Sequence, residues 1–134
     1  MIIKSFSLTN IKNINSSYIL LYGDNEGHKN DVINDFFLKN FKGEIIKYDE
    51  SQILEKKELF IETCFNESLF ENSKIIIINR VTNKLYELIN SLIEKKIHEK
   101  KIIFNSGILE KKSKLRILFE KKEDLVCIPF YQDN

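Results

Sequence analysis

The sequence lacks alanine and tryptophan altogether, whereas isoleucine, lysine and asparagine are abundant. Because those three residues have A/T-rich codons and alanine does not, we attribute the bias to genomic base composition. A lysine excess of this origin is weak evidence for nucleic-acid binding. The net charge is only +1, so the molecule as a whole has no strong electrostatic preference for a partner.

Cysteine and histidine are also scarce, with two residues of each. Cys64 and Cys127 are far apart and lie among apolar residues, so we expect free, buried thiols in a reducing cytosol. His28 and His98 offer no spacing typical of a metal site, and we interpret both as solvated surface residues. We therefore expect no metal centre.

Long apolar runs are absent too. None approaches the ~18–20 residues of a membrane-spanning helix, and the first residues lack the charged-then-apolar order of a secretion signal. We expect a soluble, cytoplasmic protein with no membrane partner. The 134 residues, 43% of them hydrophobic, suffice for one domain with one core.

Short apolar runs alternate with helical apolar spacing from residue 18 onwards. The runs predict strands at 18–22, 44–48, 74–79, 101–105 and 125–128. The helical spacing predicts helices within 26–41, 49–65 and 82–93 and around 115–119, the second opened by a capping box of Asp49 and Gln52. This alternation predicts a three-layer α/β domain, in which helices cover both faces of a five-stranded parallel sheet with right-handed crossovers. Residues 1–17 remain ambiguous.

The stretch 66–80 combines two features that favour opposite environments. Ile75 to Ile78 form an unbroken β-branched run, which is typical of a strand buried on both faces. Leu69 and Phe70 precede it in a short polar connector. The pair could cover the domain's own core or anchor another protein, and the pattern alone leaves both alternatives open.

The glycine turn after the first strand lies where an α/β domain would hold a phosphate-binding loop. Such a loop needs G-x-x-x-x-G-K-[ST], and here only Gly23 and Lys29 fit, because His28 and Asn30 occupy the second glycine and the hydroxyl position. An acidic side chain in the loop, such as Glu26, would repel a phosphate by about 4 kcal/mol at ~4 Å. We predict a degenerate phosphate loop.

The metal-binding carboxylate that such a site also needs is missing, because Asn79 and Arg80 follow the third strand. Ser106-Gly107 is interpreted as a turn, and Asp49-Glu50 as a helix cap with its dipole partner. We therefore expect no cofactor, no catalytic residue and no enzyme activity. The alternative is a small P-loop nucleotide-binding enzyme with a divergent loop.

Several segments together resemble the N-terminal domain of the delta subunit of the bacterial DNA polymerase III clamp loader. They are Leu20 to Gly27, Ser68-Leu69-Phe70, Ser106-Gly107, Leu109 to Arg116, and Cys127 to Tyr131 with Asp133. Jointly, the S-L-F and L-x-K-K-S-K-L blocks are fairly specific. The resemblance covers nearly all residues from 18 onwards.

The resemblance implies an AAA+-like fold without ATPase activity, belonging to an accessory subunit of a DNA polymerase holoenzyme in DNA replication. Its partner would be the ring-shaped sliding clamp, the beta subunit. Leu69 and Phe70 would insert into the clamp's hydrophobic pocket, with Ser68 and its flanking glutamates at the polar rim. Family members continue into a second small domain and a helical collar that joins the other loader subunits. Neither is present here, so residues 1–134 look like an isolated or truncated domain.

Two further expectations concern surfaces. The helix at 53–65, beside the Leu-Phe pair, would displace the clamp segment that supports the ring interface, and so help to open or unload the ring. Residues 91–122 carry ten Lys/Arg against four Glu, including Lys111, Lys112 and Lys114. This basic stretch is either a solvated face exaggerated by codon bias or a surface that contacts DNA weakly.

Overall fold

The computed structural model describes residues 1–4, 16–65, 73–95 and 100–131. Its centre is a five-stranded sheet in the order β2-β3-β4-β1-β5, and every pairing is parallel. The strands are β1 (Tyr18–Tyr22), β2 (Glu44–Asp49), β3 (Lys74–Val81), β4 (Lys100–Ser106) and β5 (Val126–Pro129). The parallel five-stranded sheet predicted from the alternating pattern is confirmed.

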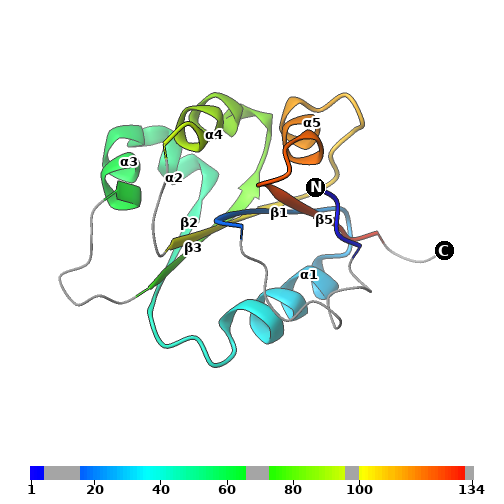
Figure 1. The fold of residues 1–134 in the computed structure, drawn as a ribbon, viewed down its shortest axis with the longest axis horizontal. Helices are drawn as coiled ribbons and strands as arrows, with labels where there is room; N and C mark the ends of the chain where they lie inside the picture. The colour runs from blue at the N-terminus through cyan, green and yellow to red at the C-terminus, as the bar shows by residue number, and fades with distance from the viewer. Residues whose placement is uncertain (5–15, 66–72, 96–99, 132–134) are drawn as a thin grey trace.

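Helices cover both faces of this sheet (Figure 1). They are α1 (Glu26–Val32), η2 (Ile33–Leu38), α2 (Glu50–Glu55), α3 (Lys57–Phe65), η3 (Asn83–Leu85), α4 (Tyr86–Ile93) and α5 (Lys114–Lys121). The connection from β1 to β2 runs along the sheet in the opposite direction to the other three. Since each crossover has the same hand, this one connection places α1 and η2 alone on one face, below the sheet in Figure 1.

The β3 strand explains why an unbroken apolar run was needed. Ile76 and Ile78 face the core under α2 to α5, whereas Ile75 and Ile77 face the smaller core under η2. All four are buried, as predicted. The alternating direction of side chains along a strand supplies both cores from the same run.

The first predicted helix differs from the structure at its end. α1 stops at Val32 and continues as a π-helical segment, η2, which ends at Leu38 instead of residue 41. Ile33 and Phe37 of this segment pack into the core on that face of the sheet. Gly43 does not stop the helix; it lets the backbone pass the carbonyl of Ser73, where a Cβ would lie 1.9 Å from that oxygen.

The second predicted helix is two helices. The capping box is confirmed, with the Asp49 amide donating to Gln52 Oε1 at 2.8 Å. The helix then breaks at Lys56, whose φ of −137° and ψ of 60° lie outside the helical region. Nothing in the local sequence explains this break. Both halves still reach the core, α2 through Ile53 and α3 through Phe60.

The two edges of the sheet differ in how they are covered. Residues 1–3 lie along β5: the Ile3 amide donates to the Cys127 carbonyl at 2.9 Å, and the Cys127 amide donates to the Met1 carbonyl at 3.0 Å. The opposite edge strand, β2, leaves Ile45 40% exposed. Cys64 and Cys127 are free and buried, as predicted. In the part of the chain that the structure describes, no helix has both the length and the apolarity to cross a bilayer.

Candidate functional site

The carboxyl edge of the sheet contains the point at which the direction of winding changes. β1 and β4 are neighbours, but the chain leaves β1 into α1 on one face and leaves β4 towards α5 on the other (Figure 1). The two departures leave a crevice at the strand ends, which is where open α/β sheets bind their ligands. The glycine turn, which was predicted to be a degenerate phosphate loop, lies at this crevice.

Gly23 is required here by packing. Its φ of +121° lies in a region that side chains rarely adopt, and a Cβ would lie 1.9 Å from the carbonyl oxygen of Phe130. The Gly23 amide donates to the Gly107 carbonyl at 3.0 Å, and the Asn25 amide donates to the Phe130 carbonyl at 3.2 Å. The turn is therefore held between the chain leaving β4 and the chain leaving β5.

The backbone donors of this turn are largely used within the protein. Besides the amides of Gly23 and Asn25, the Glu26 amide donates to the Asp24 carbonyl at 3.1 Å. The His28 amide donates to Asn25 Oδ1 at 3.1 Å, which caps α1. A phosphate-binding loop needs amides that are free to face the anion. Five of the seven amides from Gly23 to Lys29 donate within the protein, because the Lys29 amide also reaches the Asn25 carbonyl.

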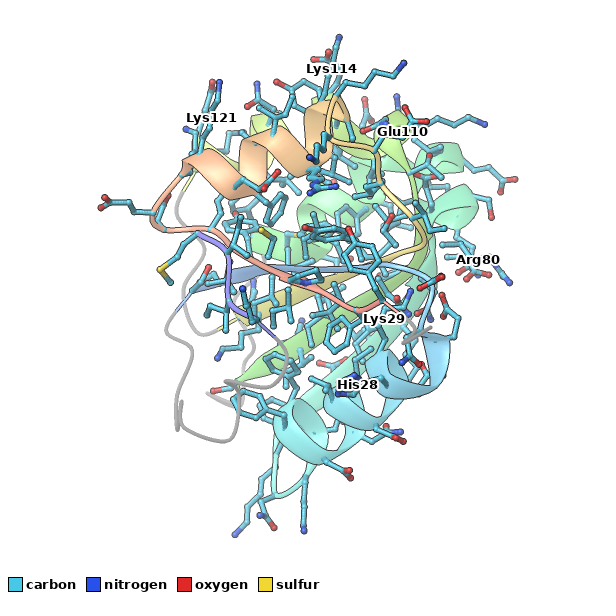
Figure 2. The ribbon with its side chains drawn as sticks, turned by 90° about the vertical axis from the view of Figure 1, so that its right-hand side faces the viewer. His28, Lys29, Arg80, Glu110, Lys114 and Lys121 are labelled. Atoms are coloured by element: carbon cyan, nitrogen blue, oxygen red, sulfur yellow. The ribbon has the colours of Figure 1, made fainter. Side chains whose placement is uncertain are left out.

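Lys29 matches the phosphate-binding lysine in sequence but does not extend into the crevice. Its side chain is fully buried, and Figure 2 shows it pointing from α1 towards the sheet. The ammonium Nζ lies 2.5 Å from Glu26 Oε1 and 2.7 Å from the Ser106 carbonyl oxygen. Lys29 thus ties α1 to the end of β4. The neighbouring His28 is exposed, as predicted, and packs edge-on against Phe130.

The end of β3 has no carboxylate, and amides and a guanidinium occupy the position instead. Asn105 Nδ2 donates to Asn79 Oδ1 at 3.0 Å, which joins the ends of β4 and β3. The Arg80 guanidinium pairs with the Asp49 carboxylate. Sequence reasoning treated Glu50 only as a helix-dipole partner. In the structure Glu50 is buried and accepts from the Thr82 amide at 2.9 Å, so it fastens α2 to the end of β3.

The predicted clamp-binding residues Ser68, Leu69 and Phe70 lie outside the described residues. Their flanks are described: α3 ends at the half-buried Phe65, and β3 begins at Lys74 after the exposed Ser73. Because β3 is parallel to β1, Lys74 begins β3 at the amino edge of the sheet, whereas the glycine turn lies at the carboxyl edge.

The predicted basic stretch is divided by the fold. Lys111, Lys112 and Lys114 are exposed around the start of α5, and Figure 2 shows Lys114 extending away from the domain. Lys112 lies 3.6 Å from Glu110, and the Lys114 ammonium lies 5.8 Å from the Tyr86 ring centre. Lys101, by contrast, is at the amino end of β4, where burial lowers its pKa. Lys101 therefore belongs to a different element from Lys111, Lys112 and Lys114.

No group of histidine, cysteine, aspartate and glutamate in the described ranges could hold a metal ion. The fold and site define an α/β domain with an all-parallel sheet, whose glycine turn is filled by the protein's own groups. Comparison with known proteins adds no identification: no family model matches the chain, and no curated protein is significantly similar to it.

Proposed function

We propose that this chain is a cytoplasmic, non-catalytic AAA+-like domain of the clamp-loader delta type, which binds the replication sliding clamp and helps to open or unload the ring. The observation that carries the non-catalytic part is Lys29. Its ammonium is buried against Glu26 and the Ser106 carbonyl. The Lys29 ammonium, which would hold a nucleotide phosphate in a phosphate-binding loop, therefore has a structural role.

Leu69 and Phe70 are the proposed anchor. Burial of a leucine and a phenylalanine contributes about 1.5–3 kcal/mol each. Together they contribute about 3–6 kcal/mol, which is less than the roughly 8 kcal/mol of a micromolar complex, so neighbouring contacts supply the rest. The described residue that follows their segment, Ser73, leads into β3 at the amino edge of the sheet. A partner bound there would leave the carboxyl-edge crevice open.

The neighbouring helix α3 supplies a second contact. Leu59 on this helix is 56% exposed, whereas Phe60 and Cys64 face the core. Opening a ring needs differential affinity for its open state, since a ligand that binds both states equally shifts nothing. We assign anchoring to Leu69 and Phe70 and displacement of the clamp's interface segment to α3.

The test is binding of the cognate sliding clamp by surface plasmon resonance. Leu69→Ala with Phe70→Ala should abolish binding, with circular dichroism and the unfolding midpoint unchanged. Ile108→Ala is the matched control, because Ile108 is 67% exposed but follows β4 at the opposite edge. If the double variant unfolds, the pair covers the domain's own core; if it folds and binds normally, the anchor is elsewhere. Either result overturns the proposal.

The rival function, a nucleotide-binding enzyme with a divergent loop, has a separate test. Equilibrium dialysis with ATP and Mg²⁺ should give no binding in the micromolar range, because the turn's amides and Lys29 are already engaged and cannot hold the triphosphate. Micromolar ATP binding would favour the rival.

A further surface is proposed for DNA in the assembled loader. Lys111, Lys112 and Lys114 are exposed and project from one region around the start of α5. Such lysines suit the phosphate backbone, and the binding they provide is weak and salt-dependent.

A further inference from the structure

The carboxyl-edge crevice is a cleft of about 660 Å³. This volume lies within the roughly 300–1,000 Å³ of small-molecule sites. Polar groups from the ends of β2, β3 and β4 and from α1 line it, among them Glu26, Asp49, Asn79, Arg80, Thr82 and Asn105. The cleft lies at the change of winding direction between β1 and β4.

A β-bulge shapes one wall of this cleft. Between the pairs Ile78–Phe104 and Val81–Ser106, β3 contains one residue more than β4. Arg80 in this bulge has a φ of +57°, a strained conformation for a residue with a side chain. Bulges and strained residues are over-represented beside functional sites, where they redirect side chains. Here Arg80 of the bulge pairs with Asp49, and both residues line the cleft.

Among the residues that line the cleft, Asn105 has a buried hydrogen-bond acceptor without a partner. Asn105 is only 7% exposed, and its Nδ2 donates to Asn79. Its Oδ1 is buried and has no hydrogen-bond partner among the described residues. A buried polar atom without a partner costs stability, so it points to a donor that completes the site.

The chemistry of the lining restricts that donor. The charged pairs Glu26–Lys29 and Arg80–Asp49 balance, so the cleft does not favour an anion or a cation. None of the described lining residues is aromatic, which leaves no surface on which a base would stack. Donors and acceptors both occur among the lining residues: the Arg80 guanidinium pairs with the Asp49 carboxylate, and Asn105 adds an amide oxygen. A ligand hydroxyl group can bind both a donor and an acceptor of the cleft, because it accepts and donates hydrogen bonds.

We infer that this cleft binds an uncharged ligand with neighbouring hydroxyl groups, in which one hydroxyl donates to Asn105 Oδ1 and the next accepts from Arg80. The hydroxyls could belong to a free sugar or to the ribose of a nucleoside. The site shares no residue with the proposed clamp-binding surface of Ser68, Leu69 and Phe70.

The test uses ¹⁵N-labelled full-length chain and follows the side-chain amide signals of Asn79 and Asn105 by NMR. The probes are D-ribose, adenosine, 2′-deoxyadenosine and inorganic phosphate. We expect saturable shifts at both amides with ribose or adenosine, with a dissociation constant in the low-millimolar range or tighter. Binding of ribose identifies a sugar site, and binding of adenosine alone identifies a nucleoside site.

Arg80→Gly is the decisive variant, since glycine adopts a φ of +57° without strain and the fold should be kept. It should weaken binding about tenfold through the lost guanidinium hydrogen bond. Asn40→Gly is the matched control, because Asn40 has a φ of +67° and is not among the residues that line the cleft. The inference fails if neither diol gives saturable shifts, if deoxyadenosine or phosphate binds as well as adenosine, or if Arg80→Gly binds normally.

Discussion

At the scale of single residues, the two glycines of the first turn have different roles. Gly23→Ala would force a side chain into a φ of +121° and against the Phe130 carbonyl. We expect a loss of at least about 2 kcal/mol in the free energy of unfolding. Gly27→Ala is the control: it lies in α1, where the nearest atom to a Cβ is 3.9 Å away.

Gly27→Ala should stabilise the protein by about 0.5–1 kcal/mol, because alanine favours the helix. Urea unfolding followed by circular dichroism measures both effects. Two equal losses would mean that the turn needs both glycines and would contradict the packing explanation.

The two buried thiols give a prediction about pH. Burial raises the pKa of Cys64 to about 12 and that of Cys127 to about 11, from an ordinary value of 9.0. A pKa that is raised in the folded state stabilises folding fully below pH 9. That contribution is lost as the pH rises towards the folded value, because only the unfolded thiol ionises there. Between pH 8 and pH 10, each thiol should cost about 1 kcal/mol of unfolding free energy.

Urea unfolding at these two pH values measures the loss. The variant with Cys64→Val and Cys127→Val should lose correspondingly less stability between them. The native thiols should also react slowly with a thiol reagent at pH 8 and rapidly in urea. Fast reaction of the native protein would show that one thiol is accessible.

At the scale of elements, the contact between η3 and α5 rests on one side chain. Asn83 Oδ1 accepts from Ser113 Oγ at 2.7 Å and from the Leu115 amide at 3.2 Å. Asn83→Ala would leave both donors without this acceptor, and Ser113 is buried. We expect a loss of about 1–3 kcal/mol in the free energy of unfolding.

Thermal and urea unfolding measure this loss, and Lys84→Ala is the control because Lys84 is exposed in the same turn. A double-mutant cycle with Ser113→Ala should give a coupling energy above about 0.5 kcal/mol. Additive losses would show that the two side chains do not stabilise the contact jointly.

The elements also show what the sequence could predict. The strands were predictable because each buried strand is a continuous apolar run, such as Ile75 to Ile78. The π-helical segment was not, because Ile33 and Phe37 fit an α-helix and a π-helix equally well. The helix break at Lys56 was not predictable either, because no glycine or proline marks it in the sequence.

The site was predictable only in part. The mismatched loop residues predicted a degenerate turn, but not that Lys29 would reach back to Ser106, because that contact depends on the position of β4. The unpartnered Asn105 oxygen also had no sequence signal. Its significance comes from the bulge on the neighbouring strand, which is a property of the assembled sheet.

At the scale of the whole molecule, charge is distributed over separate surfaces. Exposed lysines lie around the start of α5 at 111, 112 and 114. Others lie at 39 and 42, between η2 and β2, and at 47, within β2. Both sets carry three positive charges, so they form a matched pair for testing whether DNA contacts one surface. General electrostatic attraction would treat the two sets alike.

Replacement of Lys111, Lys112 and Lys114 by glutamine should weaken binding of primed duplex DNA, measured by fluorescence anisotropy across a salt series. The salt dependence, as the slope of log K against log salt concentration, should fall by up to about 3, since each phosphate contact contributes about 0.9. The same replacement of Lys39, Lys42 and Lys47 should leave the slope unchanged, because those lysines lie on other elements. Equal losses of affinity in both triple variants would show that DNA binding depends only on the net charge of the protein. Binding that is insensitive to salt would contradict the proposed DNA contact.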